Sequence, residues 1–186
     1  MAATTAVGTG EVRRRPTRPE PLRLRVLEVS VSLVVLAGLL WQVADNWTGF
    51  VSTASQLLPW LVIVVIADLL PVPIWGSVEL MMSFPVLLAS AFVFPPYIAG
   101  SLSFVGTLDL RELRGEISPL RDLYNRSNVT ASVLVASWIF HQFGISTLAW
   151  PEVLAIAFVA LIADMVVNFS LVILGAHLLT GLPAVR

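Results

Sequence analysis

Residues 106–130 read GTLDLRELRGEISPLRDLYNRSNVT and carry four arginines and four carboxylates, although the chain on either side is almost continuously apolar. The whole chain of 186 residues has 11 basic and 12 acidic side chains, so about a third of its charge falls in this one stretch. A short charged segment between two apolar runs is typical of a loop that joins membrane-spanning helices. The stretch therefore predicts a loop outside the bilayer, with spanning segments before and after it.

The composition predicts the same class of protein. The chain is 57% hydrophobic and 12% charged, with a mean hydropathy of +0.87, whereas soluble domains carry about 25% charged residues. The fold class expected is all-α, a polytopic membrane helical bundle. The chain has no cysteine, which excludes disulfides and thiolate metal sites. Its basic residues form no nucleic-acid-binding pattern, so the expected partner is the lipid bilayer. Because all of them are arginine, a bias that suggests a bacterial genome, the expected bilayer is a bacterial cytoplasmic membrane.

The apolar segments number six when the prolines are used as boundaries. A spanning helix needs roughly 20 mainly apolar residues, and Pro71, Pro73 and the pair Pro95-Pro96 interrupt the helical pattern. The predicted spans cover about 24–43, 54–70, 79–94, 96–109, 127–143 and 151–179.

The arginines predict the orientation of these spans. Six of the 11 lie between residues 13 and 25, four lie between 111 and 126, and the last is Arg186. Six spans place all three groups on one side, and the positive-inside rule makes that side the cytoplasm. Both termini are therefore expected inside. Residues 1–21 are expected to form a disordered basic cytoplasmic tail, and 110–126 an amphipathic cytoplasmic loop.

Two stretches depart from ordinary spans. Residues 96–109 would give a helix of only about 21 Å, against roughly 30 Å of hydrocarbon. Ala99, Ser103 and Thr107 form a small-residue face that permits close helix packing, so spans three and four are expected to form a tight hairpin. Residues 71–78, PVPIWGSV, predict irregular backbone, which is either a cytoplasmic turn or the wall of a binding site.

Polar residues within the spans are the candidate ligand contacts. Asp164 and Asn168 are four residues apart and share a helix face. A carboxylate at a helix centre is costly in a membrane, so Asp164 is expected to face the bundle interior. Its candidate partners are Asn168, Asn128 and an arginine from the loop. The alternative is that this face forms only a hydrogen bond between helices.

Charged residues near the cytoplasmic ends form a second set of candidates. Asp68 and Glu79 flank the PVPIWGSV turn and, with Asp109, form either an acidic cluster at the inner mouth of the bundle or ordinary solvated boundary residues. In the charged loop, the expected contacts to lipid phosphates or to a cytoplasmic partner are made by Arg111, Arg114, Arg121 and Arg126. The loop is otherwise a connector resting on the bilayer, in which Pro119 begins a helical turn.

No enzyme motif is present. The sequence has no P-loop, no H-E-x-x-H and no G-x-S-x-G, and it has two histidines. We therefore expect a protein without catalytic residues, metal or cofactor.

Two segments carry a family resemblance. FPVLLASAFVFPPYIAGSLSFVGTLDLRELRG and PLRDLYNRSNVTASVLVA resemble the N-terminal six-span membrane region of bacterial signalling proteins that precedes an HD-type phosphohydrolase or a diguanylate cyclase domain. The architecture is also similar to that of the S-components of energy-coupling-factor transporters. The first resemblance implies a membrane sensor that acts on a cytoplasmic output domain, and the second implies a substrate-binding component that works with an ATPase partner.

These observations predict a non-catalytic sensory or small-ligand-binding membrane module coupled to cytoplasmic signalling. Two alternatives stay open. One is the substrate-binding membrane component of a transporter, and the other is a structural subunit of a membrane complex that packs through the face of Ala99, Ser103 and Thr107.

Overall fold

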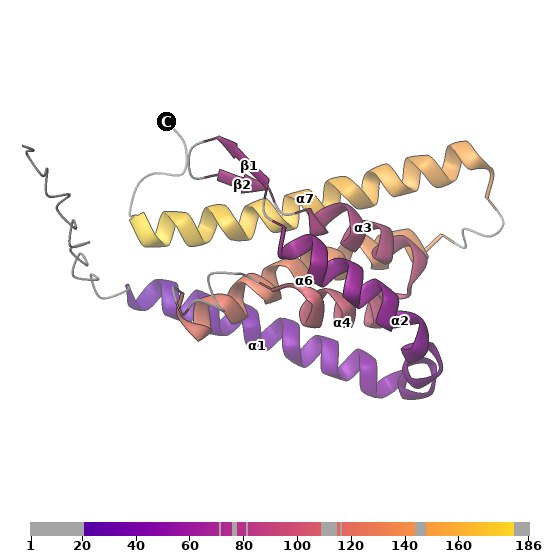
Figure 1. Cartoon of the computed structure of the whole chain (residues 1–186), viewed down its shortest axis with the longest axis horizontal. Coiled ribbons are helices and arrows are strands. Elements are labelled where there is room, and N and C mark those ends of the chain that lie inside the picture. The colour runs from indigo at the N-terminus through magenta and orange to yellow at the C-terminus, as the bar shows by residue number, and fades with distance from the viewer. Residues whose placement is uncertain are drawn as a thin grey trace, which may run out of the picture.

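The computed structural model describes residues 21–70, 72–75, 78–80, 82–108, 115, 117–143 and 148–180. These residues form helices and one short hairpin, so the all-helical class expected from the sequence is confirmed. In chain order the elements are α1 (Leu22–Asp45), α2 (Trp47–Asp68), β1 (Val72–Trp75), β2 (Val78–Leu80), α3 (Ser83–Val93), α4 (Pro96–Gly106), α6 (Pro119–His141) and α7 (Trp150–Thr180) (Figure 1).

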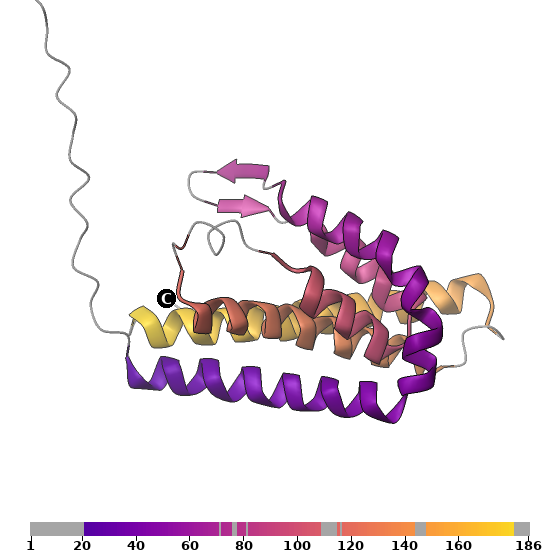
Figure 2. The ribbon, with the colours of Figure 1, turned by 60° about the horizontal axis from the view of Figure 1, so that its bottom comes forward.

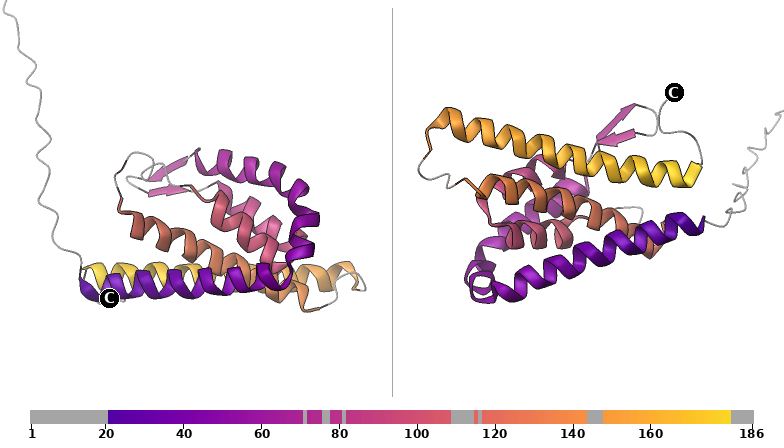
Figure 3. Two further views of the ribbon diagram at one scale, coloured as in Figure 1. Left: turned by 90° about the horizontal axis from the view of Figure 1, so that it is seen from below. Right: turned by 180° about the vertical axis from the view of Figure 1, so that it is seen from behind.

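The helices fall into a long set and a short set. α1, α6 and α7 run the length of the molecule beside one another, whereas α2, α3 and α4 gather over one half of it (Figures 2 and 3). The β1–β2 hairpin lies over the other half. At 1.5 Å per residue, the 11 residues of α3 or α4 give about 16 Å, and the 31 residues of α7 give about 46 Å. α3 and α4 therefore extend along only part of α7.

The ends of the elements are sorted between the two ends of the bundle. The start of α1, the start of α6, the hairpin and the end of α7 lie towards one end, and the α1–α2 junction and the start of α7 lie at the other (Figure 2). This is the arrangement that alternating crossings of a layer produce.

Within the described part of the chain, three helices are long and apolar enough to cross a membrane, namely α1, α2 and α7. Their large apolar side chains face outward, for example Val34 on α1, Ile63 on α2 and Phe158 on α7. Among the described residues, the interior contains as many buried polar or charged side chains as buried hydrophobic ones, 14 of each. An apolar exterior around a polar interior is the distribution that a lipid environment favours.

α2 begins earlier than the sequence predicts. A connection was expected over about 44–53, but Asn46 alone separates α1 from α2. The polar residues that indicated a loop are accommodated inside the helix. Ser52 Oγ and Thr53 Oγ1 each donate a 2.9 Å hydrogen bond to the Gly49 carbonyl, so neither hydroxyl needs solvent.

The predicted third span, 79–94, is wrong at its start. Residues 78–80 form β2, which pairs antiparallel with β1 so that Val72 faces Leu80 and Pro73 faces Glu79. The helix α3 begins only at Ser83. The described residues of the PVPIWGSV segment, 72–75 and 78, thus belong to two paired strands, in which one strand supplies hydrogen-bond partners to the other.

α6 extends eight residues further toward the N-terminus than the predicted fifth span, 127–143, so the second half of the predicted loop is helical. Pro119 occupies the first turn, as predicted, and Ser118 Oγ accepts a hydrogen bond of 3.4 Å from the Arg121 N–H. Within the helix, Arg126 Nε lies 2.7 Å from Asp122 Oδ2. This pairing at i, i+4 lets charged residues continue the helix.

The small-residue face of α4 packs inside the chain. Ala99 and Ser103 are fully buried, Thr107 is 6% exposed, and the Thr130 hydroxyl of α6 lies 3.5 Å from that of Ser103. The turn between α3 and α4 is made by Phe94 and Pro95. The predicted hairpin of spans three and four is therefore present, and its small residues serve contacts within the bundle.

Candidate functional site

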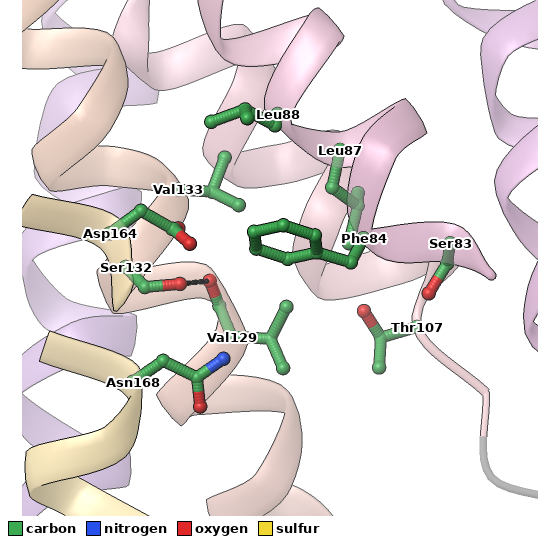
Figure 4. A pocket seen from close by; sticks show the side chains of 10 residues that line it. All are labelled: Ser83, Phe84, Leu87, Leu88, Thr107, Val129, Ser132, Val133, Asp164 and Asn168. Atoms are coloured by element: carbon green, nitrogen blue, oxygen red, sulfur yellow. Dashed lines mark hydrogen bonds between the residues drawn. The ribbon is translucent and has the colours of Figure 1, made fainter. Parts of the chain in front are cut away.

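A pocket of about 90 Å³ lies between the short and the long helices (Figure 4). Its walls come from α3, α6, α7 and the residue that follows α4. The lining side chains are Ser83, Phe84, Leu87, Leu88, Thr107, Val129, Ser132, Val133, Asp164 and Asn168.

The position of the pocket follows from the lengths of the helices. Ser83 and Phe84 begin α3, and Thr107 directly follows α4, whereas Asp164 is the 15th of the 31 residues of α7. The pocket therefore lies where two short helices end beside the middle of the longest one. Helix ends carry backbone groups without partners inside the helix, which makes such meeting points common places for polar ligands.

Asp164 is the one charged side chain among the lining residues. It is 1% exposed, and its Oδ2 atom has no hydrogen-bond partner among the described residues. Its carboxyl group points into the pocket toward the Phe84 ring (Figure 4). A buried carboxylate without a partner is costly and normally meets a donor or a cation. The arrangement can therefore accept a hydrogen bond or a positive charge from a bound molecule.

The serine beside Asp164 has two acceptors within reach, the Asp164 carboxyl group and a backbone carbonyl. Ser132 comes from α6 and lies next to the carboxyl group, but its hydroxyl donates a 2.9 Å hydrogen bond to the Val129 carbonyl (Figure 4). A hydroxyl has a single proton to donate. The Ser132 hydroxyl can therefore donate either to the Val129 carbonyl or to the Asp164 carboxyl group at one time.

Asn168 lines the same pocket as Asp164, as expected for two residues on one helix face. Its Oδ1 atom accepts a 3.0 Å hydrogen bond from Asn128 Nδ2, which joins α7 to α6. The Asn128 Oδ1 atom is buried and has no partner among the described residues. Asn128, one of the partners considered for Asp164, thus pairs with its neighbour Asn168.

Asp68 lies outside the pocket lining but is connected to it. Its Oδ1 accepts a 2.5 Å hydrogen bond from Ser83 Oγ, and its Oδ2 accepts a 2.7 Å hydrogen bond from the Leu108 N–H. One carboxylate thus ties the end of α2 to the start of α3 and to the residue after Thr107. Asp68 was expected to form an acidic cluster with Glu79 and Asp109. Glu79 lies in strand β2, and Asp109 lies outside the described residues.

Of the four loop arginines, two lie outside the described residues and two belong to α6. Arg111 and Arg114 lie outside the described residues. Arg126 pairs with Asp122, and the Arg121 N–H bonds Ser118. None of the pocket-lining residues is an arginine, so the pairing of Asp164 with a loop arginine has no counterpart in the described pocket.

Several interior polar residues were not singled out from the sequence. Ser83 and Ser132 line the pocket, yet serine is common in apolar helices and gives little signal by itself. Glu28 of α1 is 1% exposed and acts electrostatically on Tyr124, whose hydroxyl donates a 2.7 Å hydrogen bond to the Leu171 carbonyl. The sequence pattern does single out Glu28, because a carboxylate inside the first predicted span is unusual.

Comparisons with known proteins found no match. No protein-family model matches the chain, and neither a curated protein nor a solved structure is similar to it at a significant level.

Proposed function

We propose that this chain is an integral membrane module that binds a small ligand and passes the binding event to the cytoplasm, without catalysis. The observation that carries the proposal is Asp164, a carboxyl group that is 1% exposed, lacks a partner at Oδ2 and points into a pocket. A residue with only a packing role would have its polar atoms paired within the bundle.

The proposed topology has six crossings, with both termini and the 110–126 loop in the cytoplasm of a bacterial cell. The distribution of arginines along the chain supports this orientation, as does the sorting of element ends between the two ends of the bundle. α3 and α4 supply helix for only part of their crossings.

A relay from the pocket to the cytoplasm has two routes. Thr107 forms one wall of the pocket and is followed at once by Leu108, which is held by Asp68, and then by the charged loop. Asp164 forms the opposite wall and belongs to α7, the last of the described helices. A ligand that touches both walls would change the separation between α7 and the start of the loop. An output domain on either element could respond to that change.

A second candidate is the substrate-binding membrane component of a transporter that works with an ATPase partner. The observation that favours it is the place of the pocket, at the meeting point of helix ends beside the middle of α7. Secondary transporters often bind substrate near the middle of the bilayer between discontinuous helices. Both candidates require the same ligand site.

The structural-subunit alternative loses the surface on which it depended. Ala99, Ser103 and Thr107 are buried within the chain, so this face is not available to another protein. A purely structural role would have to use the outward apolar faces of α1, α2 or α7.

The test is a ligand screen on the protein in lipid nanodiscs, with thermal unfolding as the readout. The screen holds small amines, alcohols, carboxylic acids and alkali cations, and compares the wild type with Asp164→Leu. A ligand-binding module predicts at least one compound that raises the Tm of the wild type and leaves the variant unchanged. The proposal is wrong if both proteins fold and no compound distinguishes them.

Flux measurements separate the two candidates. Proteoliposomes that contain the chain and a co-purifying ATPase would accumulate the identified ligand if the chain belongs to a transporter. A sensor predicts binding without accumulation.

A further inference from the structure

The chemistry of the pocket walls indicates the class of ligand, in an inference that rests on the proposed function. We propose that the pocket takes a short amino alcohol, with its ammonium group at Asp164 and its hydroxyl group at Thr107.

The size of the pocket limits the ligand first. The volume of about 90 Å³ is several times the roughly 10–15 Å³ of cavity volume that one water needs, so the pocket has room for a few waters or a small molecule. Typical pockets for drug-sized ligands measure about 300–1,000 Å³. Vitamins, nucleotides and lipid head groups with their phosphates are therefore too large.

The wall at Asp164 selects for positive charge. The carboxyl group is the one charged group among the lining residues, and its Oδ2 lacks a partner among the described residues. The neighbouring Asn168 Oδ1 already accepts from Asn128 Nδ2, and the Ser132 hydroxyl donates to the Val129 carbonyl. The Asp164 Oδ2 atom is therefore the unpaired acceptor on this wall among the described residues. An ammonium group has three donors and no acceptor, so it can donate to this carboxylate oxygen and neutralise its charge. A carboxylate ligand would meet repulsion there.

The wall at Thr107 selects for a second polar group. Thr107 is 6% exposed, and its Oγ1 has no hydrogen-bond partner among the described residues. A threonine hydroxyl both donates and accepts, so a ligand hydroxyl would satisfy it in either sense. Its neighbour on this wall, Ser83, already donates to Asp68.

The space between the two walls is apolar. The Phe84 ring lies between Thr107 and Asp164, flanked by Val129 and Val133 (Figure 4). The apolar region between the two polar walls suits a short hydrocarbon chain in the ligand. The aromatic ring also attracts a nearby ammonium group. An inorganic cation needs oxygen atoms on all sides, whereas the oxygens here stand on opposite walls. A two-ended organic cation fits the arrangement better.

The experiment titrates ethanolamine into the protein in lipid nanodiscs and measures the binding heat and the shift in Tm. Three matched probes accompany it: ethylammonium lacks the hydroxyl, ethylene glycol lacks the ammonium group, and glycolate carries the opposite charge. We expect ethanolamine to bind most tightly, ethylammonium to bind about two- to tenfold more weakly for the loss of one hydrogen bond, and the other two to give no signal.

Variants test the two walls separately. Asp164→Asn keeps the shape but removes the charge, and ethanolamine binding should fall by about tenfold or more. Thr107→Val should abolish the advantage of ethanolamine over ethylammonium. Asp45→Asn, at the exposed end of α1, is the control and should bind as the wild type does. Size-exclusion chromatography shows whether each variant is folded.

The probe series on the wild type decides the question even if a variant fails to fold. A response to ethylene glycol or glycolate equal to that of ethanolamine would overturn the inference, as would no response to ethanolamine at all. If the broader screen instead finds another compound whose effect requires Asp164, the amino-alcohol assignment is wrong and the ligand-binding function stands. If no compound requires Asp164, both are wrong.

Discussion

Ser83 Oγ donates a hydrogen bond of 2.5 Å to Asp68 Oδ1, and this contact fixes the start of α3 to the end of α2. The second oxygen of the same carboxylate receives the Leu108 N–H, so the segment after α4 is held there too. The negative charge of the Asp68 carboxylate also stabilises α3, because it lies near the N-terminus of that helix, where the helix dipole is positive. The frame of the pocket is thus set by a residue that does not line it.

Asp68→Asn should destabilise the protein by about 1–3 kcal/mol. The amide nitrogen of asparagine would replace one of the two carboxylate oxygens that accept hydrogen bonds from Ser83 Oγ and the Leu108 N–H. Thermal unfolding in detergent measures the effect, with Asp45→Asn as the exposed control. Ser83→Ala should cost less, and the double variant should cost less than the sum of the two, since both remove the same contact. Additive effects would show that the two residues act separately.

Asp164→Asn should have the opposite effect and leave the ligand-free protein as stable as the wild type or more stable. The change removes a buried carboxyl group whose Oδ2 lacks a partner among the described residues, and such groups reduce stability where they serve function. Comparison of the Tm values without ligand tests this. A clear fall in Tm would mean that Asp164 holds the bundle together.

Gly106→Ala should destabilise the bundle by about 1–3 kcal/mol. A Cβ atom at this position would lie 2.8 Å from Cγ1 of Val64, a fully buried and stiff side chain on α2. Gly38→Ala is the matched control, because a Cβ there meets nothing within 4 Å and alanine favours the helix by about 1 kcal/mol. Similar Tm values for the two variants would contradict the close approach of α4 to α2.

Asn128→Ala and Asn168→Ala should be coupled. Their hydrogen bond joins α6 to α7, and bonds of this kind between membrane helices contribute on average about 0.6 kcal/mol. A double-mutant cycle on unfolding in mixed detergent gives the coupling energy. A value of zero would show that the pair is not formed in the folded protein.

Cysteine labelling tests the orientation, and the natural chain, which has no cysteine, needs no prior substitution. With an impermeant maleimide on intact cells, Asn46→Cys and Ala149→Cys should react, because both positions are exposed at the proposed outer end of the bundle. Ser118→Cys should react only after the membrane is opened. Labelling of position 118 in intact cells would reverse the topology.

The pattern of the sequence identified part of the pocket and missed the rest for a physical reason. Asp164 and Asn168 were found because a helix puts residues four apart on one face, and a buried carboxylate in a span is rare enough to be informative. Ser83 and Thr107 reach the pocket only because α3 begins and α4 ends beside the middle of α7. This proximity depends on tertiary packing, which the periodicity of a single helix does not show.

The errors in helix boundaries share a cause. The sequence pattern predicts starts of α2 and α6 that are too late, because polar residues are typical of loops. In the folded chain Thr53 bonds the backbone of its own helix and Asp122 pairs with Arg126 one turn away. Polar groups that find partners within a helix do not end it, and composition alone does not show where the partners are.

The brevity of α3 and α4 imposes an order on biosynthesis. Eleven apolar residues are too few for a translocon to release as an independent span, whereas α1 and α2 have the length to partition into lipid as they leave the ribosome. Some partners of the short pair precede it, such as Asp68 and Val64 of α2, but others follow it. Ser137 of α6 donates a 2.9 Å hydrogen bond to the Phe94 carbonyl, and the Thr130 hydroxyl lies 3.5 Å from that of Ser103. The α3–α4 hairpin therefore completes its contacts only after α6 has been synthesised.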